Sequence, residues 1–174
     1  MKYFITVLII LFFSCNDEKN LKTFLRTADI PISSAIEIKT VHTDSGLVSS
    51  KLNSPKMLNF SNSNFPYFEF PEKIEVILFD ENNNQTKIVA DYAISYSNSD
   101  LIDLRGNVIV STYLLDTLIT EQLYYDRGEE WLFTNFDFRY ASADKDIYGK
   151  GFDSDKSFDQ IKFLRVNGYV SLEE

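Results

Sequence analysis

Apolar and polar residues alternate with a period of two along most of the chain after residue 35. Polar clusters rich in Asn, Asp, Ser and Gly interrupt the alternation at residues 80–85, 97–100, 126–129 and 154–157. Successive side chains of a β-strand point to opposite faces, so this pattern is typical of strands that bury one face and are joined by polar turns. The sequence therefore predicts an all-β domain over residues 36–174.

Residues 135–140 show the alternation most clearly, because Phe136, Phe138 and Tyr140 are separated by polar residues. A helix would distribute these aromatic side chains around its axis, whereas a strand places them together on one face. We expect this face to be buried. The same spacing of two is found in three other apolar sets, namely Ile36 and Ile38; Ile74, Val76 and Leu78; and Val108 and Val110.

The strand pattern also repeats along the chain. Tyr92, Leu123 and Phe152 are spaced at about 30 residues, and each precedes a polar turn and then two apolar runs. These runs are residues 101–104 and 108–110, 131–134 and 136–140, and 161–164 and 169–172. Such a unit cannot bury its apolar face alone and must stack on the next. The stacked antiparallel strands would form either a closed sandwich or an open, curved trough.

At the N-terminus, Lys2 precedes an apolar run at residues 3–13 that ends just before Cys15, the only cysteine. The run is too short to cross a bilayer, which needs about 20 apolar residues. This layout is typical of a lipoprotein signal peptide, although Phe12 stands where the usual motif has Leu. An ordinary signal peptide, or a buried strand with an incidental cysteine, is the alternative.

The lipoprotein interpretation divides the chain into three parts. Residues 1–14 would be a signal peptide that is removed, and residues 15–35 would be the acylated Cys15 and a polar tether. Residues 36–174 would be the β domain. The protein would then leave the cytoplasm and stay at a membrane.

The chain has 17 Lys and Arg residues against 26 Asp and Glu residues, a formal net charge of -9 at pH 7. An acidic surface repels nucleic acid and anionic lipid head groups. Nucleic acid is therefore excluded as a partner, and an anionic amphiphile would have to be held by its apolar part. With Cys15 acylated no disulfide can form, so stability must come from the burial of apolar side chains.

The sequence contains no catalytic or metal-binding motif. His42 is the only histidine, lies in a predicted strand, and has no Gly-x-Ser-x-Gly elbow to work with. One histidine and one acylated cysteine cannot complete a tetrahedral metal site, and the aspartates at residues 153–159 lack the glycine and final glutamate of a calcium loop. Gly149 and Gly151 precede no helix that could bind phosphate, and we expect them to permit a bulge or a tight bend. The sequence predicts no enzyme, no metal and no cofactor.

Four segments resemble, in order and spacing, the LptC family in the form seen in Bacteroidetes-type bacteria. They read Ala-Asp-Tyr-Ala-Ile at residues 90–94, Leu-Arg-Gly-Asn-Val at 104–108, Leu-Tyr-Tyr-Asp at 123–126 and Ile-Tyr-Gly-Lys-Gly-Phe at 147–152. Residues 66–80 are similar as well, so the resemblance covers roughly residues 45–155. Members of this family are periplasmic components of the lipopolysaccharide exporter.

The resemblance implies a twisted, V-shaped β-jellyroll of antiparallel strands, shared with LptA and the N-terminal domain of LptD. It implies a carrier that accepts lipopolysaccharide from the inner-membrane transporter of LptB, LptF and LptG and passes it to LptA. Acyl chains would lie in the trough, and partners would add strands at its open edges. Other family members have a transmembrane helix where this chain has Cys15, which would anchor the protein to the periplasmic side of the inner membrane.

The lining of the trough is a face rather than a motif in this family, so candidates come from the alternation pattern. A shift of one residue in the register would turn any strand's set outward. The candidates for contact with the lipid are Val108, Val110, Leu123, Tyr125, Phe136, Phe138, Tyr140 and Phe152.

A second function remains open on the sequence, because Asp17 and Glu18 shortly after Cys15 resemble a surface-export signal of Bacteroidetes lipoproteins. In that case the protein would be a surface or structural β-rich lipoprotein at the outer membrane that binds protein or glycan. An enzyme is the least favoured class, because His42 has no partner residue in a recognisable motif.

Overall fold

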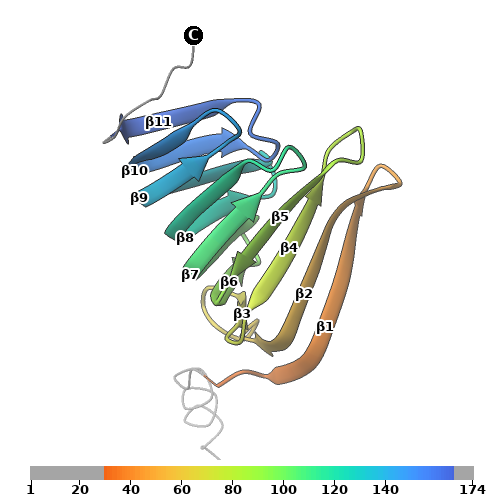
Figure 1. Ribbon diagram of the computed structural model, residues 1–174. Coiled ribbons are helices and arrows are strands. Elements are labelled where there is room, and N and C mark those ends of the chain that lie inside the picture. Colours follow the sequence, from red (N-terminus) through yellow and green to blue (C-terminus); the bar gives the residue numbers. More distant parts are fainter. Residues whose placement is uncertain (1–29, 167–174) are drawn as a thin grey trace, which may run out of the picture. The chain divides into compact units, whose positions relative to one another are not determined.

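The computed structural model describes residues 30–166, and every regular element in this range is a β-strand. The chain divides into two units, Met1–Ile30 and Pro31–Glu174, and the strands belong to the second. They form one sheet of 11 strands (Figure 1). Their bounds are β1 Ser33–Asp44, β2 Leu47–Asn59, β3 Tyr67–Phe70, β4 Ile74–Phe79, β5 Gln85–Ala90, β6 Tyr92–Tyr96, β7 Leu101–Ser111, β8 Thr117–Asp126, β9 Trp131–Ala141, β10 Asp146–Asp155 and β11 Ile161–Val166.

The sheet is a meander in which each long strand pairs antiparallel with the next one in sequence. β3 and β4 are two halves of one long strand, because both pair with β2. β5 and β6 form the next long strand, since β5 pairs with β4 and β6 pairs with β3. Both of these halves then pair with β7, and β8 to β11 follow in order. Every neighbour in the sheet is therefore reached by a short turn.

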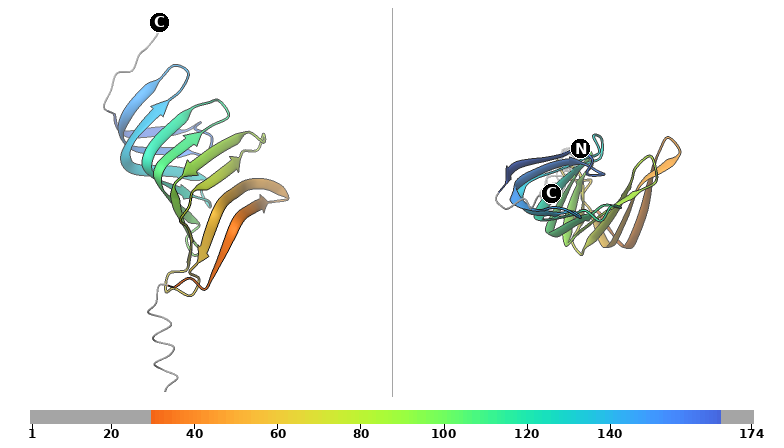
Figure 2. Two further views of the ribbon diagram at one scale, coloured as in Figure 1. Left: turned by 60° about the horizontal axis from the view of Figure 1, so that its bottom comes forward. Right: turned by 45° about the horizontal axis from the view of Figure 1, so that its top comes forward.

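A change of register by one residue recurs along the middle of the sheet. Shifts separate Arg105 from Val108 in the β7–β8 pairing, Thr120 from Tyr124 in the β8–β9 pairing, and Lys150 from Phe152 in the β9–β10 pairing. The breaks between β3 and β4 and between β5 and β6 lie on the same line. Asp91 joins the two sides of it, because its carbonyl oxygen accepts a hydrogen bond from the backbone N–H of Lys73 and its own N–H donates one to the carbonyl oxygen of Gly106. Bulges bend a strand and strengthen its twist. Because the irregularities are aligned, the strands bend together and the sheet folds along a corner (Figure 2).

Left-handed backbone conformations mark the same corner. Lys73, Gly106, Asn107 and Gly151 all have positive φ angles. Glycine adopts this conformation without a steric penalty, which explains its use at two of these positions. The expectation of a bulge is confirmed at Gly151, whereas Gly149 lies in regular pairings with Phe138 and Val166.

The corner divides the sheet into two arms. The β4 arm comprises β4, β5 and residues 108–111, 117–120, 138–141 and 146–150; the β6 arm comprises β3, β6 and residues 101–105, 123–126, 131–134 and 152–155. Each arm ends in a row of turns away from the corner, and we call the opening between these two rows the mouth. The turns of the β4 arm include residues 80–84, 112–116 and 142–145, and those of the β6 arm include residues 97–100, 127–130 and 156–160.

The hydrophobic core lies between the arms. In the β4 arm, Val110 pairs with both Ile88 and Leu118, and all three side chains are fully buried. In the β6 arm, Leu104 pairs with Leu123, and both are again fully buried. These residues belong to one continuous cluster with members from both arms. Since burial of each large apolar side chain is worth about 1.5–3 kcal/mol, the packing of one arm on the other provides much of the stability.

The all-β prediction and the expected β-jellyroll are confirmed by these strands. Two details of the sequence interpretation are wrong. The apolar runs at residues 101–104 and 108–110 are one strand, β7, interrupted by a bulge, and the runs at 131–134 and 136–140 are likewise parts of β9. Residues 33–35, expected in the tether, belong to β1. The run at residues 169–172 and Cys15 lie outside the described residues.

The predicted repeat corresponds to three hairpins, β6–β7, β8–β9 and β10–β11. Leu123 and Phe152 face the core as expected, whereas Tyr92 is displaced by one position from its row. Ala93 takes the buried position, because it pairs with Leu104 and is fully buried. Tyr92 points to the outer side, where its hydroxyl donates a hydrogen bond of 2.9 Å to Glu69.

Gly149 provides a test of how tightly β11 is packed onto β10. A Cβ atom at this position would overlap the carbonyl oxygen of Arg165 and lie 2.8 Å from the ring of Phe138. We expect Gly149→Ala to destabilise the protein by about 1–3 kcal/mol, because backbone and core must both shift. Urea unfolding followed by the fluorescence of Trp131, the only tryptophan, measures the change.

Gly128→Ala is the matched control for this substitution. Its added Cβ would meet Asp126 at 3.4 Å, an ordinary contact, and the change should stay within about 0.5 kcal/mol. Equal midpoints for the two variants would contradict the close approach of β11.

Candidate functional site

The space between the arms is the candidate site, and seven of the eight predicted lining residues face it. Each of these seven is at most 5% exposed and belongs to the core cluster. The β4 arm contributes Val108, Val110, Phe138 and Tyr140, and the β6 arm contributes Leu123, Tyr125 and Phe152. The period of two therefore identified the inner face correctly on both sides of the corner.

Phe136 is the exception, and its predicted place on the buried face is wrong. Its side chain is 47% exposed, and residues 135–137 are all exposed. Phe136 lies at the corner, where the register of β9 against β8 changes by one residue. Its backbone N–H donates a hydrogen bond of 3.0 Å to Oγ1 of Thr134. The bulge interrupts the alternation, so Phe136 does not share a face with Phe138 and Tyr140.

Aromatic side chains fill the interior at the end formed by β9, β10 and β11. The ring centroids of Phe138 and Phe152 lie 5.7 Å apart, and Phe163 stacks on Phe138 at 5.5 Å. Tyr140 also contacts Phe152, at 6.2 Å. Because Phe138 and Tyr140 come from the β4 arm and Phe152 from the β6 arm, this cluster joins the two arms.

Phe158 closes the mouth at the aromatic end. It belongs to the polar turn between β10 and β11, yet it is 7% exposed and its ring centroid lies 5.4 Å from that of Phe152 and 6.0 Å from that of Tyr140. Its φ angle of 63° is unusual for a bulky residue. The sequence indicated only a polar turn here, because a single phenylalanine among polar residues has no periodicity.

The interior is open at the other end, beside β1 and β2. A slot of about 190 Å³ lies between the arms there, with an apolar floor and a polar rim. Volume of this order holds several water molecules or a short part of an acyl chain. On the side of the β4 arm, the slot is bounded by residues of β1 and β2. On the side of the β6 arm, it is bounded by residues of β6, β7 and β8. The lining residues are Thr40, Val41, His42, Ser50, Leu52, Val76, Ser95, Ile102, Tyr125 and Arg127.

The slot is accessible because the first two strands are not covered. Leu52 and Val76 pair with each other on its floor, whereas Thr40 and His42 on β1 are exposed. His42 was expected to face solvent from a strand, and the structure places it at the rim of the slot. The interior thus changes from a packed aromatic cluster at β9–β11 to an accessible cavity at β1–β2.

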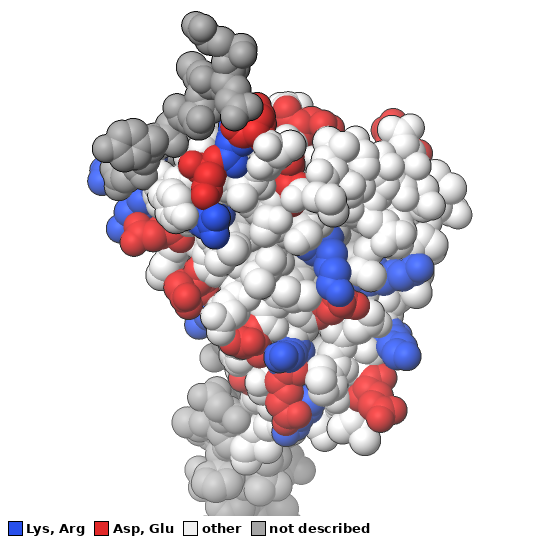
Figure 3. Space-filling model, in the orientation of Figure 1, with Lys and Arg blue, Asp and Glu red and all other residues white. Residues whose placement is uncertain are grey.

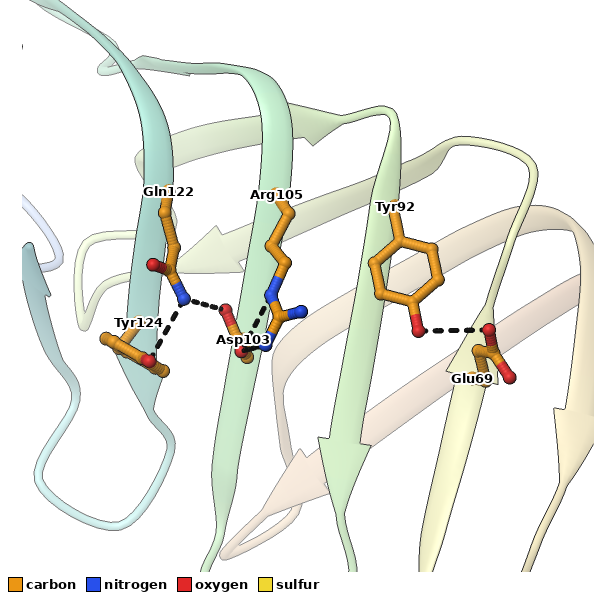
Figure 4. Close-up of polar contacts among 6 residues, drawn as sticks. All are labelled: Glu69, Tyr92, Asp103, Arg105, Gln122 and Tyr124. Atoms are coloured by element: carbon orange, nitrogen blue, oxygen red, sulfur yellow. Dashed lines mark hydrogen bonds and ion pairs between the residues drawn. The ribbon is translucent and has the colours of Figure 1, made fainter. Parts of the chain in front are cut away.

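A polar network lies on the outer side of the β6 arm (Figure 4). Asp103 is only 1% exposed, and its carboxylate accepts hydrogen bonds from Nε of Arg105 at 3.0 Å and from Nε2 of Gln122 at 2.7 Å. Gln122 also lies 3.0 Å from the hydroxyl of Tyr124. The hydrogen bond to Asp103 raises the pKa of Arg105 above its ordinary value. The network compensates a buried charge and joins β7 to β8, which is a structural role.

A larger groove of about 890 Å³ crosses the outer side of the β4 arm near the corner. Its floor includes Val89 and Ile109, which pair with each other on the face opposite the core. Lys39, Lys73, Glu75 and Asp91 line the same groove, so charges of both signs are mixed there. We consider the space between the arms the better candidate, because its floor is apolar and continuous with the buried rows.

Within residues 30–166, no group of three or more His, Cys, Asp or Glu residues is placed to hold a metal ion. No helix in this range is long and apolar enough to span a membrane.

Phe152 and Phe136 together test which residues form the interior. Phe152 is fully buried among four aromatic rings, so Phe152→Ala should destabilise the protein by about 3–5 kcal/mol. The exposed Phe136 should tolerate the same change at a cost of about 0.5 kcal/mol or less. Urea unfolding of both variants measures the difference. A large loss for Phe136→Ala would contradict its placement at the corner.

The buried side chain of Tyr125 makes the stability of the folded protein depend on pH in the alkaline range. Burial, with a smaller contribution from Glu130, raises the pKa of Tyr125 well above its ordinary value. The neutral hydroxyl therefore stabilises the folded state fully below pH about 10, and this contribution is lost as pH rises through the folded pKa. We expect Tyr125→Phe to lose less stability than the parent chain above pH about 10, measured by urea unfolding across that range. Parallel losses in both proteins would contradict the buried, neutral state of Tyr125.

Comparison with known families agrees with this geometry. A family model described as "Lipopolysaccharide-assembly, LptC-related" matches residues 3–170. No curated protein matches the chain. The match covers nearly the whole sequence, including both arms and every strand of the sheet. The chain therefore belongs to the LptC-related family of lipopolysaccharide assembly.

Proposed function

We propose that this protein carries lipopolysaccharide across the periplasm by holding its acyl chains between the two arms. In this role it accepts the lipid from the inner-membrane transporter of LptB, LptF and LptG and passes it to LptA. Membership of the family supports a role in lipopolysaccharide transport. The observation that carries the proposal is the continuous apolar interior that leads from the slot at β1–β2 to the aromatic cluster at β9–β11.

The interior suits acyl chains for a physical reason. The buried rows of Ile88, Val110 and Leu118 in one arm and Leu104 and Leu123 in the other offer no charged group to a ligand. Burial of each methylene of an acyl chain is worth about 0.8 kcal/mol, so a few methylenes provide substantial affinity without contact to the head group.

Loading requires the arms to separate, because side chains fill most of the interior. The arms are joined across the interior by packed aromatic rings, as between Phe138 and Phe152. Dispersion contacts of this kind can be replaced by contacts to acyl chains at little net cost, whereas backbone hydrogen bonds within each arm stay intact. Lipid entering at the slot would progressively replace these contacts toward β11.

The two edges of the sheet suit the transfer between partners. Within the described residues β1 pairs only with β2, and β11 pairs only with β10. Unpaired backbone groups on an edge strand can pair with a strand from another protein. In the proposed bridge, the transporter would bind at the β1 edge and LptA at the β11 edge. Acylated Cys15 would hold the chain at the inner membrane, and no chemical step is assigned to the protein.

Site-specific photocrosslinking tests the proposal. A photoreactive amino acid at Tyr125 or Phe138 should form an adduct with lipopolysaccharide in membrane vesicles that contain the transporter, and only when ATP is supplied. The same amino acid at Ile119, 41% exposed on the outer side of β8, is the matched control and should form none. Adducts are detected as a mobility shift with antibody to lipopolysaccharide.

Two outcomes would contradict the carrier role. The first is the absence of adducts from several inward positions in variants that unfold cooperatively in urea. The second is removal of the domain by protease added to intact cells, which would favour the surface lipoprotein suggested by Asp17 and Glu18.

A further inference from the structure

Most polar side chains that line the slot at β1–β2 lack a hydrogen-bond partner. The side chains of Thr40, His42, Ser50, Ser95 and Tyr125 form no hydrogen bond to any other residue within 30–166. Two of these side chains are also buried, because Ser95 is 8% exposed and Tyr125 is 5% exposed. Buried hydroxyl groups in proteins are nearly always hydrogen-bonded, and one without a partner is unfavourable. The slot therefore brings together hydroxyl groups that can bind a polar ligand.

The pairing of the strands places these hydroxyl groups on both walls of the slot, beside apolar side chains. In the β6 arm, Ser95 pairs with Ile102, and Ile102 pairs in turn with Tyr125. On the opposite wall, Thr40 of β1 pairs with Leu52 of β2. Ile102 belongs to the hydrophobic core, and Leu52 packs against it. A ligand with a polar group and an attached apolar chain fits this arrangement.

Arg127 adds a positive charge at the rim of the slot. Its Nε donates a hydrogen bond to the carbonyl oxygen of Asp100, and its Nη2 donates one to the carboxylate of Asp100, both at 3.2 Å. A guanidinium has five N–H groups, so most of its donors stay available. The side chain of Asp100 is 69% exposed, and an ion pair with so exposed a carboxylate is weak. A ligand anion can therefore bind Arg127 as well.

The slot differs from the rest of this acidic chain in its lining. None of the ten described residues that line it is acidic. On the outer side of the β4 arm, by contrast, Lys87 pairs with Glu75 and Arg139 pairs with Asp146. Figure 3 shows basic and acidic side chains interspersed on this face. An anion would meet carboxylates there, whereas the slot offers it a guanidinium and several hydroxyl groups.

The hydroxyl of Tyr125 keeps its proton and can therefore donate it in a hydrogen bond. Burial is the main cause that raises the pKa of Tyr125 above its ordinary value. The charge of Arg127 acts on the same hydroxyl and opposes this rise. Glu130 acts in the other direction, but its carboxylate is bound by Lys156 at 2.6 Å. A protonated hydroxyl and a guanidinium thus lie close enough to act on one group.

We propose that the slot binds a phosphate group of the carried lipid, with the hydroxyl of Tyr125 and the guanidinium of Arg127 as its main hydrogen-bond donors. The inference rests on the proposed function and assigns one part of the lipid to residues of that site. Phosphate oxygens are strong acceptors, and a guanidinium matches their geometry. With the phosphate at the rim, the attached chain lies on Leu52 and Ile102. The phosphate would then fix the orientation of the lipid, with its head group at β1–β2 and its chains toward β11.

Dodecyl phosphate and dodecyl maltoside separate the contribution of the head group from that of the chain, because both have the same dodecyl chain. Their dissociation constants are measured by calorimetry with the purified full chain at pH 8, below the micelle concentrations and with a chelator present. At this pH a phosphate monoester carries close to two negative charges. The chelator removes divalent cations that could link a phosphate to carboxylates. Inorganic phosphate is titrated separately, to distinguish a lipid from free phosphate as the ligand.

Two variants remove the proposed donors one at a time. Tyr125→Phe keeps the buried ring and loses only the hydroxyl, and Arg127→Gln loses the positive charge. Tyr124→Phe and Arg139→Gln make the same two changes on the outer side of the sheet and are the matched controls. The side chain of Arg139 is 46% exposed, close to the 40% of Arg127. Cooperative unfolding in urea shows that each variant is folded.

We expect the parent chain to bind dodecyl phosphate more tightly than dodecyl maltoside. Tyr125→Phe and Arg127→Gln should each weaken the binding of dodecyl phosphate about ten-fold, because each removes a hydrogen bond to a charged group. Their binding of dodecyl maltoside should change by less than about two-fold, and the controls should change by less than this for both amphiphiles. Inorganic phosphate should bind at least about ten-fold more weakly than dodecyl phosphate, because it has no chain to bury.

Several results would overturn the inference while binding of dodecyl maltoside upholds the acyl-chain site. They are a loss of dodecyl phosphate binding in only one or in neither of the two site variants, equal losses for both amphiphiles, and the same loss in Arg139→Gln. Inorganic phosphate that binds as tightly as dodecyl phosphate would overturn the assignment to a lipid. Failure of both amphiphiles to bind the parent chain would overturn the proposed function itself.

Discussion

The alignment of one-residue register shifts from strand to strand is the constraint on which the rest of the structure depends. A single bulge bends one strand, but a row of them across β7, β8, β9 and β10 bends the whole sheet at one line. Only because the bends coincide do two arms exist that can bury their apolar faces against each other. The interior, the mouth and the edges are all consequences of this row of bulges.

The distribution of apolar and charged side chains depends on the same bend of the sheet. Apolar side chains occupy the face between the arms, and acidic side chains occupy the turns, where they contact water. Acidic side chains also lie on the outer face of the strands, where those of Glu121 and Asp137 are exposed. Asp103 is buried on this face and is tolerated because Arg105 and Gln122 bind its carboxylate.

Much of the fold could be predicted from the sequence, because a half-buried strand requires an apolar residue at every second position. Val108, Val110 and Leu123 were placed correctly on that basis. The pattern failed at Phe136 and Tyr92, both near the corner, because a bulge depends on neighbouring strands and has no period of its own. Phe158 and Asp103 could not be found either, since the burial of a single aromatic residue in a turn or of a single carboxylate depends on contacts distant in sequence.

The meander has a consequence for how the chain folds. Each hairpin pairs residues that are close in sequence, so no strand must wait for a distant partner before it can form hydrogen bonds. Topologies of this kind close short loops and lose little chain entropy at each step, which favours rapid folding. Hairpins can therefore form one after another as the chain emerges into the compartment where it folds, each on the edge left by the one before it. In the proposed bridge, the edge at β11 is where a strand of another protein would continue the sheet.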